Sequence, residues 1–140
     1  MQAAQTALMP RREVRDRVRI LLADQDQLFQ EGLAQLLRRA GYAVHTAATT
    51  DEALRVAGEG DWDCLVADLN LPEAGGLGLY LQLLFQGRTR IPAVFLASWP
   101  VTALELGLGA AGWIRLLRKP CAFTDLLAAL ERCLGAPRAP

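Results

Sequence analysis

Residues 64–68 read Cys-Leu-Val-Ala-Asp, a short apolar run that ends in a carboxylate. Two further stretches follow a similar pattern, Ile20-Leu21-Leu22-Ala23-Asp24 near the start and Leu116-Leu117-Arg118-Lys119-Pro120 near the end. Short apolar runs bounded by turn-forming residues are typical of buried parallel strands. If the three strands lie side by side, two carboxylates and one ammonium group meet at the carboxyl edge of one sheet, where open α/β sheets bind their ligands. The pattern therefore predicts a charged site at this edge.

Strand-like and helix-like segments alternate along the rest of the chain. We expect the leucines and the phenylalanine of the first helix to share one buried face and Gly41 to end that helix. Five βα units in a row predict a parallel sheet with right-handed crossovers and helices on both faces. The expected strands begin at Val18 and cover 42–46, 63–67, 92–97 and 113–117. The expected helices cover 27–39, 50–57 (capped by Thr50 or Asp51) and 77–85, with a weak one after Pro100 that carries Gly107 and Gly109, and a last one from about Phe123.

The length of 140 residues is typical of a single domain. We expect a flexible leader at 1–17, one folded domain at 18–134, and a tail or the start of a linker at 135–140. The chain has 15 basic and 15 acidic residues, so no global field attracts nucleic acid or an anionic membrane. No apolar run reaches the roughly 18 residues of a membrane-spanning helix.

Other functional classes find little support in these residues. A nucleotide-binding or flavodoxin-like small-molecule-binding protein is expected to carry a glycine-rich turn after the first strand, whereas residues 24–28 read Asp-Gln-Asp-Gln-Leu. The three cysteines are odd in number, show no CxxC pairing and are far in sequence from the only histidine, His45. We therefore expect reduced thiols in a cytoplasmic protein, not a disulfide frame, a zinc site or a thiol enzyme. The sequence also shows no recognition-helix unit or basic stripe for direct contact with nucleic acid.

Four segments occur in an order that is typical of one family. They read VRILLADQDQLFQEGLAQLL at 18–37, DCLVADLNLPEAGGLGL at 63–79, IPAVFLAS at 91–98 and LLRKP at 116–120. In this order they resemble the receiver domain of two-component response regulators, and the first is closest to receivers that precede a helix-turn-helix effector. The resemblance implies a flavodoxin-like (CheY-like) doubly wound α/β fold with five parallel strands in the order 2-1-3-4-5.

The resemblance also implies a role for each charged strand end. Asp68 would accept a phosphoryl group from a sensor histidine kinase, a phosphotransfer protein or a small phosphodonor, and no other enzymatic activity is implied. Asp24, Asp68 and the backbone carbonyl of Asn70 would bind Mg²⁺, which favours oxygen ligands. Lys119 would contact the phosphoryl oxygens as a point charge, aimed by a cis bond to Pro120.

Three positions depart from the family pattern. Gln25 replaces a second acidic residue, so this metal ligand is weak or lost and Mg²⁺ binding should be weak. Asp26 follows it, but alternate residues of extended chain point in opposite directions, so Asp26 is not a direct replacement. Ala97 stands where the switch hydroxyl is usual, and Ser98, one residue later, points to the other face unless the strand bulges. Leu116 stands at the aromatic switch position.

These departures predict a degenerate receiver that signals weakly or independently of phosphorylation. The alternative is a conventional receiver that uses Asp68 and Mg²⁺ to control a DNA-binding effector. Trp99 lies in the loop expected to move on activation, although it could instead cover the pocket.

The helix after Asp68 is apolar nearly all round, with Gln82 and Gln86 as its polar members. Such a helix is either buried on all sides or a contact surface. We predict that Leu81, Leu84 and Phe85 form part of an exposed patch that binds a protein partner or a second copy of the chain. The alternative is that they are buried within the monomer.

Overall fold

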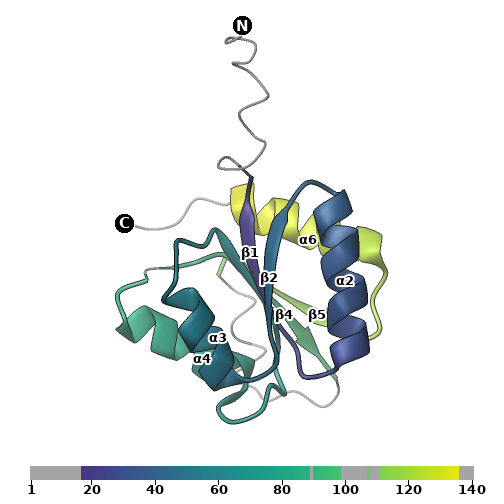
Figure 1. Cartoon of the computed structure of the whole chain (residues 1–140). Helices are drawn as coiled ribbons and strands as arrows, with labels where there is room; N and C mark the ends of the chain where they lie inside the picture. The colour runs from purple at the N-terminus through teal and green to yellow at the C-terminus, as the bar shows by residue number, and fades with distance from the viewer. Residues whose placement is uncertain (1–16, 89, 99–106, 108–110, 136–140) are drawn as a thin grey trace, which may run out of the picture.

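The computed structural model describes residues 17–88, 90–98, 107 and 111–135. Five parallel strands form one sheet in the order β2-β1-β3-β4-β5, which confirms the predicted topology (Figure 1). The strands are β1 (Arg19–Ala23), β2 (Ala43–Ala47), β3 (Cys64–Asp68), β4 (Ala93–Ala97) and β5 (Ile114–Arg118). The described helices are α2 (Gln27–Arg39), α3 (Thr50–Ala57), α4 (Gly75–Phe85) and α6 (Phe123–Gly135).

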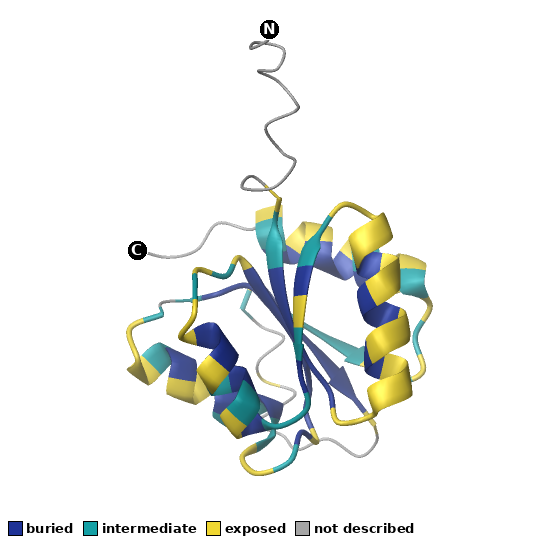
Figure 2. Cartoon of the chain, in the orientation of Figure 1, coloured by how far each residue is buried: buried dark blue, intermediate teal, exposed yellow. Residues whose placement is uncertain are grey.

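The helices cover both faces of the sheet. Helices α2 and α6 lie on one face and α3 and α4 on the other (Figure 1). Side chains of β3 alternate between the two cores, so that Cys64 and Val66 pack toward α2 and α6, while Leu65 and Ala67 pack toward α3 and α4. Because β3 is central, all five of its residues are buried, as the dark blue strands of Figure 2 show. This arrangement places the end of β3 in the middle of the carboxyl edge.

One helix start differs from the residue expected to cap it. Helix α2 has its predicted bounds, and the carboxylate of Asp26 accepts a hydrogen bond within its first turn. Helix α3 is capped by Thr49, whose hydroxyl accepts a hydrogen bond from the Glu52 N–H at 3.1 Å, and not by Thr50 or Asp51. The expectation was one residue too late because several hydroxyl and carboxylate residues compete at this position and each is a good cap.

The buried face of α2 is narrower than predicted. Leu33 and Leu37 are buried, but Gln30 and Ala34 complete that face. Leu28 and Leu36 are 83% and 41% exposed, respectively, and Phe29 is also exposed. Helical periodicity places them beside the core-facing stripe and not on it.

Several expectations lie mainly outside the described residues. They concern the leader, the tail, Trp99 and the weak helix after Pro100. The strands expected at 42–46, 63–67 and 113–117 each lie one residue later, and α4 begins at Gly75 instead of Leu77. No helix in the described part of the chain is long and apolar enough to cross a membrane.

Candidate functional site

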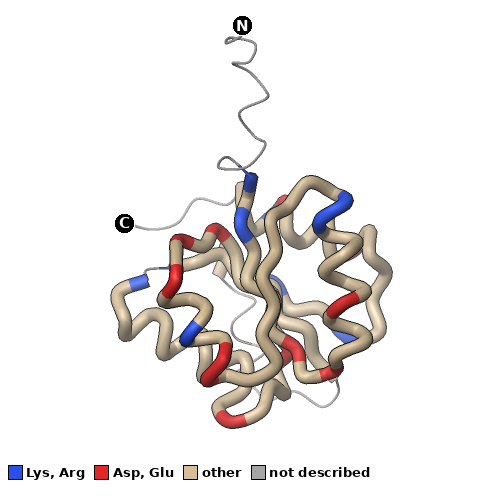
Figure 3. The backbone as a smooth tube through the Cα atoms, in the orientation of Figure 1, with Lys and Arg blue, Asp and Glu red and all other residues tan. Residues whose placement is uncertain are grey.

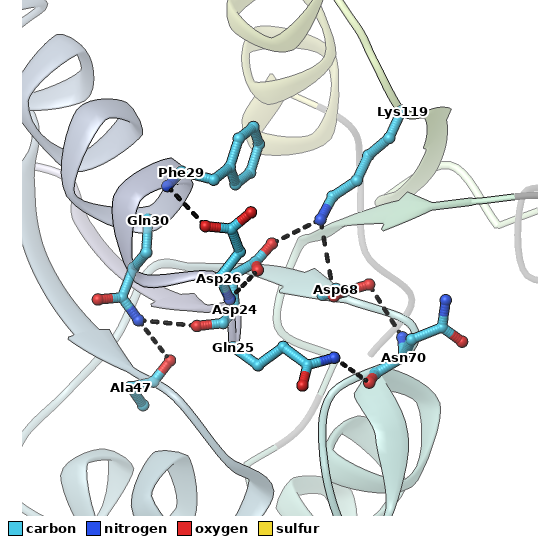
Figure 4. Close-up of polar contacts among 9 residues, drawn as sticks. All are labelled: Asp24, Gln25, Asp26, Phe29, Gln30, Ala47, Asp68, Asn70 and Lys119. Carbon is cyan, nitrogen blue, oxygen red and sulfur yellow. Dashed lines mark hydrogen bonds and ion pairs between the residues drawn. The ribbon is translucent and has the colours of Figure 1, made fainter.

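The carboxyl edge of the sheet brings together the three charged side chains that the sequence singled out (Figure 4). The Nζ atom of Lys119 lies 2.8 Å from Oδ2 of Asp24 and 3.6 Å from Oδ2 of Asp68. Both carboxylates are buried, while the lysine side chain keeps 21% of its exposure. One ammonium group therefore bridges two carboxylates that come from neighbouring strands.

Backbone contacts at the end of β1 fix the position of Asp24. Its N–H donates to the Ala47 carbonyl at 3.0 Å, which extends the pairing of β1 with β2. The buried side-chain amide of Gln30 donates to the carbonyls of Asp24 and Ala47, both at 2.9 Å. The sequence analysis missed Gln30, although a polar residue on an otherwise apolar helix face is a usable signal.

Two glycines fix the surroundings of Asp68. Its Oδ1 atom accepts a hydrogen bond from the Asn70 N–H at 2.9 Å. Gly75 has a φ of +77°, and a Cβ atom at Gly76 would lie 2.7 Å from the carbonyl oxygen of Asp68. Only glycine lets the first turn of α4 approach the backbone of β3 this closely.

Lys119 is held from three directions. Its peptide bond to Pro120 is cis, and its backbone N–H donates to the Ala97 carbonyl at 2.8 Å. The ammonium group also lies 4.6 Å from the centroid of the Phe29 ring, a cation–π distance. These contacts direct the side chain across the sheet edge to Asp24.

The residues at this edge offer oxygen ligands for Mg²⁺, but one of these oxygens already accepts a hydrogen bond within the protein. Asp24, Asp68 and the Asn70 carbonyl are oxygen ligands, as Mg²⁺ requires. However, the side-chain amide of Gln25 donates to the Asn70 carbonyl at 3.3 Å, and Asp26 accepts from the Phe29 N–H at 3.1 Å instead of facing the pocket. Within the described residues, no group of three or more His, Cys, Asp or Glu side chains is placed to hold a metal. Among these candidate ligands, the Asn70 carbonyl is therefore already engaged by a protein donor.

The three residues expected at switch positions, Ala97, Ser98 and Leu116, offer this edge little polar chemistry. Ala97 is the buried last residue of β4, and Leu116 packs against the core beneath α3 and α4. Strands β4 and β5 stay in register as far as Ala97 and Arg118, so the described strands contain no bulge that turns Ser98 toward the site. Ser98 is exposed.

Trp113 is part of the packing. Its indole N–H donates to the Tyr80 hydroxyl at 3.1 Å, and that hydroxyl donates to the Ile91 carbonyl at 2.9 Å. The chain of hydrogen bonds joins α4 to the start of the β4 and β5 region. Trp113 therefore has a structural role in the packing of α4 against the sheet.

Helix α4 exposes an apolar surface toward its C-terminal end. Phe85 is 89% exposed and Leu81 is 44% exposed, whereas Leu84 is half-buried because it packs against the core. The helix contains no charged residue, so its tube is tan along its whole length in Figure 3. We call Leu81 and Phe85 the α4 patch.

A second apolar feature was missed by the sequence analysis. A groove of about 320 Å³ lies between α2 and the start of α6, lined only by uncharged residues. Leu28, Phe29 and Leu36 line it together with Phe123. The sequence alone does not show which leucines of α2 lie beside its buried face and stay exposed, so the groove becomes visible only in the structure.

The cysteines take no part in the site. All three are free, as expected, and Cys64 and Cys133 are buried. Burial raises the pKa of each thiol above its ordinary value, and for Cys64 well above it. The thiols are therefore protonated at neutral pH and are not poised as nucleophiles.

Comparison with known proteins agrees with this geometry. A model of the response regulator receiver domain matches residues 20–131. The response regulator MprA of Mycobacterium ulcerans is 35% identical over 117 residues, which are 84% of this chain and 50% of MprA. The chain spans about half, or for one of them about a quarter, of the length of the curated relatives it matches.

Solved structures of other proteins share the fold of this chain. The chemotaxis protein CheY4 of Vibrio cholerae is 28% identical and superimposes with a TM-score of 0.75 over 84% of this chain and 99% of that chain. The non-phosphorylated receiver domain of HemR from Leptospira biflexa is 27% identical, with a TM-score of 0.75 over 89% of this chain and 99% of that chain.

Proposed function

This chain belongs to the response regulator receiver domain family, and we propose that it is an atypical member whose output does not depend on the usual phosphorylation switch. Receiver domains are modules of two-component signalling. In this one, Asp68 stands at the phosphoacceptor position and Lys119 beside it, so the outline of the site is retained. The proposal concerns what happens after a phosphoryl group reaches Asp68.

The observation that carries the proposal is the side-chain chemistry at the end of β4 and in the middle of β5. A readout of the phosphoryl group requires a hydrogen-bond donor near Asp68, and Ala97 has only a methyl group there. Ser98 is exposed beyond the end of an unbulged strand, and Leu116 has no ring that can exchange between a buried and an exposed rotamer. A group added at Asp68 therefore lacks the side chains that would convert it into a change of surface.

The α4 patch is the surface through which we propose the domain contacts another protein, a partner or a second copy of this chain. A large apolar side chain as exposed as Phe85, on a helix without charge, favours such a contact. A histidine kinase or phosphotransfer protein could still reach Asp68, because the proposal does not require that the site be inert.

Intact mass measurement tests the first part. The protein is incubated with a small phosphodonor such as phosphoramidate and millimolar Mg²⁺, beside Asp68→Ala as the matched control, and its oligomeric state is then measured by size-exclusion chromatography with light scattering. We expect little or no phosphoryl addition, and no change of oligomeric state for any fraction that is modified. Stoichiometric addition that is lost in Asp68→Ala and that shifts the oligomeric state would instead establish a conventional receiver, and the proposal would fall.

Substitution of the α4 patch tests the second part. The variant Leu81→Glu/Phe85→Glu should abolish self-association or partner binding while its circular dichroism spectrum stays that of the wild type. The matched control is Leu36→Glu, because Leu36 has a similar exposure but lies on α2, which covers the opposite face of the sheet. Equal loss of binding in both variants, or a wild type that binds neither itself nor a partner, contradicts a role for the patch.

A further inference from the structure

The acidic pocket satisfies most of its own acceptor oxygens. Asp24 accepts hydrogen bonds from the Asp26 N–H at 2.9 Å and from Lys119 at 2.8 Å. Asp68 accepts one from the Asn70 N–H at 2.9 Å and faces the Lys119 ammonium group with its other oxygen. The Asn70 carbonyl accepts from the side chain of Gln25 at 3.3 Å. Each oxygen that would bind a cation thus already has a protein donor or cation beside it.

From this arrangement we propose that Gln25 is a positioning residue that closes the acidic pocket without a divalent cation. Its amide group ties the loop after β1 to the loop after β3, while Lys119 neutralises one unit of the charge on Asp24 and Asp68. The inference rests on the proposed function. A pocket closed in this way needs no magnesium to keep its shape, which agrees with an output that does not depend on the usual phosphorylation switch.

The chemistry of the Gln25 contact admits one orientation. A carbonyl oxygen can only accept hydrogen bonds, so the nitrogen of the Gln25 amide, and not its oxygen, must face Asn70. A glutamate at position 25 has no proton to donate at neutral pH and places an anion against that carbonyl. Glutamine therefore favours direct contact between the two loops, whereas glutamate favours a cation between them.

The charges around the pocket act in the same direction. Asp24 and Asp68 carry two negative charges against one positive charge on Lys119, so the pocket has a net charge of about −1 at neutral pH. An acidic residue at position 25 would add a further unit and strengthen the attraction for a divalent cation. Asp26 does not supply that unit, because its carboxylate caps α2.

Thermal unfolding of five proteins, the wild type and four variants, with millimolar Mg²⁺ or with EDTA tests this role without any phosphodonor or partner. We expect the melting temperature of the wild type to be the same in both buffers. Gln25→Met should melt about 2 °C lower in both, because it loses one exposed hydrogen bond. Gln25→Glu should be destabilised in EDTA and rise by about 5 °C in Mg²⁺, as for a ligand at roughly ten times its dissociation constant.

Two control variants show whether the response of the melting temperature to Mg²⁺ depends on position 25 and on Asp68. Gln35→Glu makes the same charge change on the exposed face of α2 and should show no response to Mg²⁺. Adding Asp68→Asn to Gln25→Glu should remove the response, because the metal then loses a carboxylate ligand. A wild type that is stabilised by Mg²⁺ as strongly as Gln25→Glu overturns the inference, as does a Gln25→Met variant that melts with the wild type. Neither result decides the proposed function, which is tested separately by mass and oligomeric state.

Discussion

The side chains compared here form two groups, one charged or polar and one apolar. Asp24, Lys119 and Gln25 surround one part of the pocket with charges and hydrogen bonds. Ala97, the last residue of β4, and Leu116, in the middle of β5, have only carbon in their side chains. The comparison shows that placing a carboxylate and a lysine requires only the strand order and a few backbone contacts. The function proposed above depends on a separate property, the absence of a hydrogen-bond donor in the side chains at positions 97 and 116.

Of the substitutions predicted here, replacement of Lys119 should destabilise the folded protein most, because it removes the counter-charge from the charged side of the pocket. In Lys119→Met, the buried carboxylate of Asp24 loses its counter-charge next to a second carboxylate. We expect the free energy of unfolding to fall by about 2–3 kcal/mol, at the lower end of the range for buried pairs because the lysine is partly exposed. Urea unfolding followed by circular dichroism measures this loss.

A second substitution shows whether charge is the cause. Asp24→Asn in the Lys119→Met background removes one of the two unneutralised charges and should recover part of the stability. If the double variant is no more stable than Lys119→Met, lost packing of the lysine stem explains the effect.

A pair of substitutions of nearly equal volume tests whether the apolar side of the pocket, at Ala97, has a partner for a hydroxyl group. Ala97→Thr and Ala97→Val enlarge the same buried side chain, but only threonine adds a hydroxyl. Since this side offers the hydroxyl little polar chemistry, Ala97→Thr should be less stable than Ala97→Val by about 1 kcal/mol. Urea midpoints of the two variants give the difference directly. Equal stability would mean that a hydroxyl at position 97 does find a partner, and the two sides would differ less than the wild-type residues suggest.

The smallest effect is expected in alkaline solution, away from both sides of the pocket. Burial raises the pKa of the Cys64 thiol, with nearby Cys133 and Asp63 adding to the shift. Below about pH 8.5 the thiol is protonated in both the folded and the unfolded protein, so Cys64 makes no pH-dependent contribution to stability. Above that pH the unfolded thiol releases its proton while the folded thiol keeps it, and the free energy of unfolding falls as the pH rises.

The slope should be at most about 1.4 kcal/mol per pH unit for this one thiol. Stability curves of the wild type and of Cys64→Val between neutral pH and pH 9 measure it, and the variant should show the shallower decline. An identical decline would assign the alkaline loss to other groups and leave the charged side of the pocket as a candidate.

Much of the fold could be predicted from local patterns. The apolar runs that end at Asp24 and Asp68 are strands because burial on both faces requires continuous apolar sequence, and the bounds of α2 follow from its periodicity and from Gly41. The exposure of Leu28 and Leu36 could not be predicted, because leucine satisfies the periodic pattern whether or not another element covers it. Only the position of α6 decides which leucines on α2 are covered.

The site shows the same limit. The strand ends predicted that Asp24, Asp68 and Lys119 would meet, since the order of strands fixes their separation. The two hydrogen bonds of Gln30 and the contact of Gln25 with Asn70 join residues from different loops and depend on side-chain rotamers. No spacing rule along the chain carries that information.

The close approach of Gly76 to Asp68 has a consequence for mutational tolerance. Position 76 touches Asp68 through its backbone alone, and a single added carbon would lie 2.7 Å from the Asp68 carbonyl oxygen. In a library of all single substitutions, this position should reject even alanine, although it contributes no functional group. A glycine there is a steric marker of where β3 must end, and it locates the position of Asp68 for anyone comparing divergent chains in which the charged residues have changed.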